Sequence, residues 1–195
     1  MNLTINKHIM IKQLLQERLK VYNNTALINE LVDYVNKIGA TIVKTKGSKK
    51  IFVCGNGGSS SQASHLAAEL TVRYKGKRND YFALALTSDT SVITAISNDY
   101  NFDDIFAMQI ENMADSGDVL LALSTSGNSK NVNNALEKAV ELNMQTFALL
   151  GKTGGQALRI ANEALVVPSD DVAIVQEVHL MVIHLLCEYL EKFEQ

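Results

Sequence analysis

The chain has no tryptophan, one proline, two cysteines and no excess of basic residues. A single proline, Pro168, argues against long proline-rich linkers. Cys54 and Cys187 both lie in apolar stretches and are too few for a disulfide framework or a metal knuckle, so we expect buried free thiols. The 18 basic and 21 acidic residues give a net charge of −3, which provides no electrostatic case for binding nucleic acid or an anionic membrane.

Long apolar segments are also missing from the sequence. The N-terminal residues MNLTINKHIMIKQLL contain no extended apolar region of the signal-peptide kind, and no apolar run approaches the ~20 residues of a membrane span. We therefore expect a cytoplasmic protein. Its 195 residues suit one domain with a helical extension.

Residues 7–46 carry apolar side chains mostly three and four positions apart, which predicts helix. Two helices divided near Asn23 and Asn24 fit this pattern best, with Thr25 as the N-cap of the second. Their apolar stripes must be buried either against partner subunits or on the chain's own sheet, and the sequence leaves both options open.

Five short apolar runs follow, each separated from the next by a helical pattern. This alternation predicts a parallel sheet with helices on both faces, in which ligands bind beyond the carboxyl ends of the strands. The runs are residues 51–54, 81–86, 119–124, 146–150 and 164–167.

The first run leads into the turn Gly55-Asn56-Gly57-Gly58, whose glycines let the backbone approach a ligand closely. Three serines follow at positions 59–61, any of which could cap a helix whose first N–H groups would face an anion.

His65 and Glu69 stand four residues apart on this helix, so both project from one face. The two side chains make a plausible wall of an active site. The alternative is an ordinary pair on a solvent-exposed helix face.

Two nucleotide-binding motifs are not matched. The dinucleotide fingerprint requires a glycine three residues after Gly57, where this chain has Ser60. The segment Gly151-Lys152-Thr153 resembles the end of a P-loop, but Thr146 stands where the earlier glycine is required. NAD and ATP binding therefore lose their strongest sequence arguments.

The third run ends in a loop of hydroxyl side chains, residues 124–129, and a helix is expected to begin near Lys130. Hydroxyls, one glycine and a helix N-terminus can form a neutral phosphate cradle. The alternative is a serine-rich capping loop. After the second run, the comparable position holds polar residues 87–91, then a short helix, and then Asn98 and Asp99.

The last helix, predicted at about residues 170–192, carries polar residues among many apolar ones. Gln176 and His184 are eight residues apart, about 80° around the helix, so they can converge on one site. His179 is about 140° from His184 and is expected to be a core histidine with a backbone partner.

Taken together, four stretches of this sequence resemble the phosphoheptose isomerases of the sugar isomerase (SIS) domain family. They are CGNGGSSSQASHLAAEL, ALTSDTSVITAISNDYNFDDIF, GDVLLALSTSGNSKNV and VPSDDVAIVQEVHLMVIH. The resemblance implies a flavodoxin-like, three-layer α/β SIS domain with a five-stranded parallel sheet. It also implies one domain over residues 1–195, with helices at 1–47 packing in the oligomer and an α/β core at 48–195. The implied assembly is a homotetramer.

The resemblance further implies conversion of sedoheptulose 7-phosphate to D-glycero-D-manno-heptose 7-phosphate, with Glu69 as base and His184 as acid. One zinc ion per protomer would be held by His65, Glu69, Gln176 and His184, residue types that bind zinc. The implied substrate contacts are Asn56, Gly57, Gly58, Glu69, Asn98, Asp99, Ser124, Thr125, Ser126, Ser129 and Gln176. Aldose–ketose isomerisation needs a base, an acid and a polarised carbonyl oxygen, which such a set can supply.

The sequence departs from the family pattern at two positions. Gln62 stands where many members have an acidic residue, and Ile174 stands where many have an arginine; Arg73 is retained and could contact the sugar phosphate. Alternative functions are a non-catalytic SIS protein that binds sugar phosphate or a replication initiator, and an isomerase of another sugar phosphate. The product could serve lipopolysaccharide or capsule synthesis.

Overall fold

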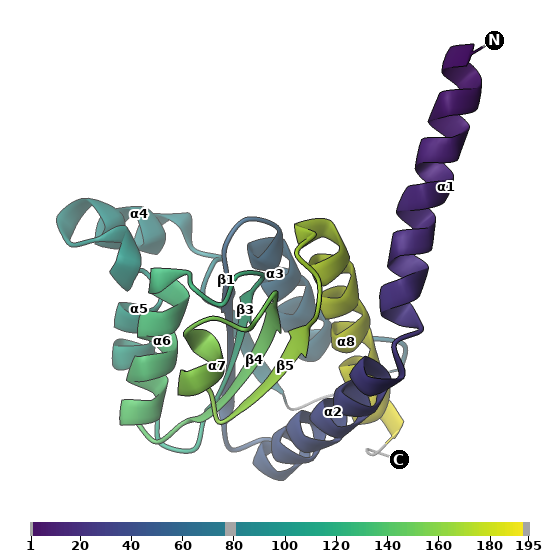
Figure 1. The fold of residues 1–195 in the computed structure, drawn as a ribbon. Helices are drawn as coiled ribbons and strands as arrows, with labels where there is room; N and C mark the ends of the chain where they lie inside the picture. Colours follow the sequence, from purple (N-terminus) through teal and green to yellow (C-terminus); the bar gives the residue numbers. More distant parts are fainter. Residues whose placement is uncertain (1, 77–80, 193–195) are drawn as a thin grey trace.

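A computed structural model describes residues 2–76 and 81–192 of the chain and shows a three-layer α/β fold (Figure 1). Five parallel strands pair in the order β2-β1-β3-β4-β5, which is the flavodoxin-like order, so the predicted fold class is confirmed. The strands are β1 (Lys50–Gly55), β2 (Phe82–Ala85), β3 (Val119–Ser124), β4 (Gln145–Gly151) and β5 (Glu163–Val167).

Helices cover both faces of the sheet (Figure 1). On one face, α2 (Thr25–Thr45), α3 (Gly58–Thr71) and α8 (Val172–Lys192) form one apolar cluster with the strands. The other face packs against α4 (Thr90–Asp99), α5 (Ala107–Met113), α6 (Lys130–Glu141) and α7 (Ala157–Ile160), with a short 3-10 turn at Phe102–Asp104. All six residues of β3 are buried, as expected of a central parallel strand.

The second N-terminal helix is capped by Asn24, whose side chain accepts a hydrogen bond from the backbone N–H of Leu27 at 3.2 Å. The prediction of Thr25 as N-cap is therefore wrong by one residue, because the asparagine makes the capping bond and Thr25 is already helical. This helix, α2, buries its apolar stripe on the chain's own sheet and on α8.

The first helix, α1 (Asn2–Tyr22), points away from the body of the molecule (Figure 1). Its base is tied to α8, because the Arg18 guanidinium and the Tyr22 hydroxyl both bond to the Glu177 carboxylate, at 3.0 and 3.2 Å. Apolar side chains along α1 are exposed: Ile9, Met10, Ile11, Leu14, Leu15 and Leu19.

By length and composition alone, α8 could cross a membrane, which inspection of the sequence did not anticipate. In the fold, Val175, Val178 and Val182 on this helix are buried in the cluster that covers one face of the sheet. The helix thus packs as a core element of the domain, and its apolar character serves that packing.

Both thiols are buried and neither forms a disulfide, which confirms the prediction. Cys54 lies in the cluster on the α4–α7 side of the sheet, and Cys187 lies in the cluster on the α2–α3–α8 side. Burial raises the pKa of the Cys54 thiol to about 12, so this thiol stays protonated.

Candidate active site

The turn after β1 brings the start of α3 against α8. Gly57 has φ of +56°, a conformation that favours glycine, and it precedes the first helical residue, Gly58. The prediction that one of the serines at 59–61 caps this helix is wrong, because the helix begins before them. The backbone N–H groups of Ser59 and Ser60 donate instead to the carbonyls of Asn56 and Gly57, each at 3.0 Å.

Gln176, near the start of α8, meets this turn. A Cβ atom added to Gly58 would lie 2.6 Å from the Gln176 Nε2 atom, so the amide can rest here only because position 58 lacks a side chain. Gln62 holds the backbone of Gln176 in place, because the Gln62 Nε2 donates to the Gln176 carbonyl at 2.7 Å. Ile174 is buried, so an apolar side chain suits this position, where many family members have an arginine.

One turn further along α3, His65 reaches His184 of α8. Their Nε2 atoms are 3.3 Å apart, and the rings meet edge to face with centroids 5.3 Å apart. The Glu69 carboxylate lies 3.5 Å from the His65 Nε2 atom. The structure therefore joins three of the four predicted metal-binding side chains into one partly exposed cluster, which we call the His65–Glu69–His184 cluster.

On its other side, His184 lines a hollow of about 440 Å³ between the base of α1, α8 and the segment after α3. The Tyr74 ring in this segment lies 6.1 Å from the His184 ring. Lys75 pairs with Glu188, and its backbone N–H donates to Glu191 at 2.7 Å. These contacts tie the end of α3 to α8, and they leave His184 accessible from the hollow.

The loop from Ser124 to Ser129 is held in shape by its own hydroxyls. The Ser124 hydroxyl accepts the Gly127 N–H at 3.1 Å and lies 3.4 Å from the Ser129 hydroxyl. The Ser126 hydroxyl accepts the Asn128 N–H at 3.1 Å, so its own O–H remains available to a ligand. The expected helix starts at Lys130 behind this loop.

Sequence reasoning missed Asn131, which joins two parts of the site. Its side-chain amide and that of Asn56 exchange hydrogen bonds of 2.8 and 2.9 Å, and Asn131 is buried. The turn after β1 is thereby tied to the first turn of α6. The only signal in the sequence is an amide two residues after the hydroxyl-rich loop, which does not identify its partner.

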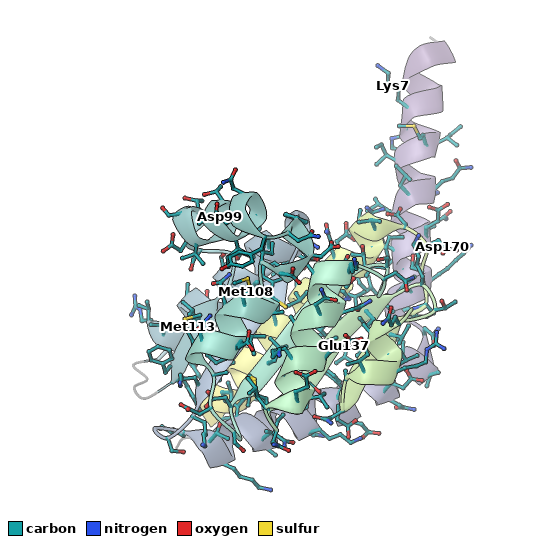
Figure 2. The ribbon with its side chains drawn as sticks, turned by 90° about the vertical axis from the view of Figure 1, so that its left-hand side faces the viewer. Lys7, Asp99, Met108, Met113, Glu137 and Asp170 are labelled. Atoms are coloured by element: carbon teal, nitrogen blue, oxygen red, sulfur yellow. The ribbon has the colours of Figure 1, made fainter. Side chains whose placement is uncertain are left out.

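Asn98 and Asp99 are not brought to the His65–Glu69–His184 cluster. The Asn98 amide donates to the Asp99 carboxylate at 2.8 Å, and both residues are exposed at the end of α4. In Figure 2, Asp99 lies far from Asp170, which is two residues before the start of α8. Because α4 and α8 cover opposite faces of the sheet, one copy of the fold keeps these residues apart.

The fit of a metal ion can be judged from the cluster itself. Among residues 2–76 and 81–192, no three His, Cys, Asp or Glu side chains form a ready-made metal site. However, the 3.3 Å between the two Nε2 atoms is about the spacing of two nitrogen ligands on one tetrahedral zinc ion with bonds of ~2.0–2.1 Å. The donor types therefore fit zinc, with Gln176 needed as a further ligand.

Comparisons with known proteins show which family the chain belongs to. The SIS domain family model matches residues 23–151. The phosphoheptose isomerase of Helicobacter pylori (strain P12) is 51% identical over 143 residues, which cover 73% of this chain and 74% of that protein. The phosphoheptose isomerase of Sulfurimonas denitrificans is 43% identical over 182 residues, which cover 93% and 92%.

Solved structures extend the match to the whole fold. The structure of phosphoheptose isomerase GmhA from Neisseria gonorrhoeae superposes with a TM-score of 0.84 at 34% identity, covering 95% of this chain and 98% of that one. A phosphoheptose isomerase from Francisella tularensis gives the same TM-score at 32% identity, covering 94% and 97%. This chain therefore belongs to the SIS domain family and, within it, to the phosphoheptose isomerases.

Proposed function

We propose that this chain is an aldose–ketose isomerase that converts sedoheptulose 7-phosphate to D-glycero-D-manno-heptose 7-phosphate. The observation that carries the proposal is the His65–Glu69–His184 cluster, in which a carboxylate and a second imidazole flank one imidazole nitrogen at 3.5 and 3.3 Å. Family membership supplies the substrate class, and the cluster supplies groups able to move a proton.

In this proposal Glu69 takes the proton from the carbon beside the carbonyl and returns it to the neighbouring carbon. His184 protonates the ketose carbonyl oxygen as the enediol forms, and it then accepts the proton of the neighbouring hydroxyl as the aldehyde carbonyl develops. The Glu69 side chain is partly exposed and His184 lines the hollow, so a sugar can approach both groups. Electrons and protons balance without an external oxidant or reductant, because isomerisation moves one hydrogen between the two carbons and one between their oxygens.

His65, Glu69, Gln176 and His184 would hold one zinc ion per protomer. When bound, such an ion polarises the sugar carbonyl and so favours the enediol. His65 has its Nε2 atom directed at both Glu69 and His184, which suits it to a ligand role.

The phosphate would bind the loop formed by Ser124, Thr125, Ser126 and Ser129. This assignment is supported by the free O–H of Ser126 and by the helix that begins behind the loop. Asn56, Gly57, Gly58 and Gln176, which meet at the start of α3, would contact the sugar. Asn98 and Asp99 also belong to the proposed substrate contacts, although one copy of the fold holds them away from the His65–Glu69–His184 cluster.

We further propose that the chain assembles as a homotetramer in the cytoplasm. The row of exposed apolar side chains on α1 supports an assembly, since a helix that projects from the body needs a partner to cover such a row. Neither nucleic acid nor membrane is a proposed partner. The product would enter synthesis of a heptose-containing glycan, either lipopolysaccharide or capsule.

Turnover of purified protein on ketose phosphates of five, six and seven carbons tests the proposal. We expect the seven-carbon substrate to give the highest kcat/KM. A higher kcat/KM on a pentose or hexose phosphate would reassign the substrate. Binding of all three without turnover would show a non-catalytic sugar-phosphate-binding protein.

A further inference from the structure

The loop at Ser124–Ser129 rests on a second turn, residues 151–156, which we call the supporting turn. Gly127 in the loop has φ of +64°, and a Cβ added to it would lie 1.9 Å from the carbonyl oxygen of Gly154. A Cβ added to Gly155 would lie 2.7 Å from the Gly127 carbonyl carbon. The two backbones are therefore in direct contact, and no side chain fits between them.

Hydrogen bonds fix the loop and the supporting turn in register. The Gly127 carbonyl accepts the N–H of Ala157 at 2.9 Å. The Asn128 side chain bridges the two segments, because its Oδ1 accepts the N–H of Gln156 at 3.0 Å and its Nδ2 donates to the Ser126 carbonyl at 3.1 Å. Asn128 thus holds Ser126, the residue whose hydroxyl is free to meet a phosphate.

The topology explains why these two segments meet. β3 and β4 are parallel neighbours with Ser124 opposite Leu150, so the chain leaves both strands at the same edge of the sheet. Gly151 lies so close to the loop that an added Cβ would be 2.6 Å from the Thr125 carbonyl oxygen. The segment that resembles the end of a P-loop in the sequence therefore supports a neighbouring loop.

We propose that Asn128 and Gly155 are positioning residues for phosphate binding, acting through the shape that they impose on the Ser124–Ser129 loop. The inference rests on the proposed function, because it takes the loop as the phosphate site. Neither residue belongs to the proposed set of substrate contacts. Their role is to hold the loop's hydroxyls and N–H groups in the arrangement that a phosphate needs.

The experiment uses two substitutions, each with a matched control. Asn128→Ala removes the bridge at an exposed position, and Asn112→Ala removes an exposed amide that donates to the Met108 carbonyl within α5. Gly155→Ala places a Cβ against Gly127. Gly47→Ala is its control, because Gly47 also has a positive φ but no atom lies within 4 Å of a Cβ added there. The readouts are kcat and KM for sedoheptulose 7-phosphate and the inhibition constant of inorganic phosphate.

Asn128→Ala should raise both KM and the inhibition constant of inorganic phosphate about threefold to tenfold, with kcat within about twofold of wild type; tenfold corresponds to about 1.4 kcal/mol. Gly155→Ala should change the same constants in the same direction and by more, while both controls stay within about twofold.

A folded Asn128→Ala variant with unchanged KM and unchanged phosphate inhibition would overturn the inference, even if Gly155→Ala fails to fold. A fall in kcat at constant KM would overturn it too, because it would place the loop at the reacting carbons. Failure of the proposed function would look different. In that case the wild-type protein itself would neither turn over ketose phosphates nor bind inorganic phosphate.

Discussion

The Nε2 atoms of His65 and His184 face each other at 3.3 Å although the residues are 119 positions apart in the chain. One lies on α3 and the other on α8, and both helices pack on the same face of the sheet. Two ring nitrogens at this distance are placed to hydrogen-bond to each other. Substitutions of these two histidines and of the neighbouring Glu69 should therefore lower turnover while the protein still folds.

Glu69→Gln should lower kcat about 100-fold or more while the fold and most of the sugar-phosphate affinity persist, because an amide of the same shape cannot accept the proton from carbon. Steady-state kinetics with a thermal melt measure both effects. Glu111→Gln, on the exposed side of α5, is the matched control and should keep wild-type kcat. Wild-type turnover by Glu69→Gln would remove this residue from the role of base.

His65→Ala should lower both zinc content and turnover, because one imidazole ligand is lost from a site with few others. His8→Ala, on the projecting helix α1, removes an exposed imidazole elsewhere and should change neither. Elemental analysis of purified protein gives the metal content, expected at up to about one zinc per protomer. A fully active preparation without any divalent metal would rule out the proposed zinc site.

Ser126→Ala should raise KM with little change in kcat, because the lost O–H donor would contact the phosphate equally in the ground state and the transition state. A loss of about 1 kcal/mol, which is typical of one hydrogen bond, corresponds to roughly a fivefold rise. Ser48→Ala removes an exposed hydroxyl that donates to the Thr45 carbonyl, and it should leave KM unchanged. A large fall in kcat at constant KM would show that the loop acts elsewhere.

His179 should make stability depend on pH. It is fully buried, its Nε2 lies 3.1 Å from the Leu150 carbonyl, and burial lowers its pKa from 6.5 to about 4. Between these values the unfolded chain binds a proton that the folded chain excludes, so this contribution is complete above pH 6.5 and is lost as the pH falls toward 4.

Urea unfolding of wild type and His179→Gln at pH 7, 6 and 5 tests this dependence. In this range His179 should add a slope of up to about 1.4 kcal/mol per pH unit to wild type, and the variant should lack that slope. His8→Gln, which changes an exposed histidine, should keep the wild-type slope. Equal slopes in wild type and His179→Gln would contradict the assignment.

Leu15→Glu should reduce the mass of the assembly, because it places a charge in the exposed apolar row of α1 where a partner subunit would have to bury it. Size-exclusion chromatography with light scattering measures the mass directly. Gln16→Glu adds the same charge beside it at an exposed polar position and should leave the assembly intact. An unchanged mass for Leu15→Glu would mean that this row is not the interface.

The strands and the helix faces could be predicted because each is a local pattern. The run at residues 119–124 is β3 to the residue, and the prediction that His179 is a core histidine with a backbone partner is confirmed by its contact with the Leu150 carbonyl. Helix starts were less predictable, because Asn24 and Gly57 decide them through single hydrogen bonds and one backbone conformation.

Contacts between loops could not be predicted from the sequence. The bonds from Asn56 to Asn131 and from Asn128 to Gln156 depend on which strands are neighbours, and hydrophobic periodicity does not give that order. The same limit applies to Asn98 and Asp99, since they end α4, a helix that follows β2 but packs on the far face of the sheet. The direction of α1 depends on Arg18 and Tyr22 meeting Glu177.

The two buried thiols allow local opening of the native protein to be measured without introducing a label. Cys54 and Cys187 are each shielded within a different layer of the domain, and a thiol must reach solvent as thiolate before an alkylating reagent can modify it. Alkylation kinetics of the folded protein thus record how often each layer opens. Equal rates at both thiols correspond to opening of the whole domain, and faster modification of one identifies the layer that separates first.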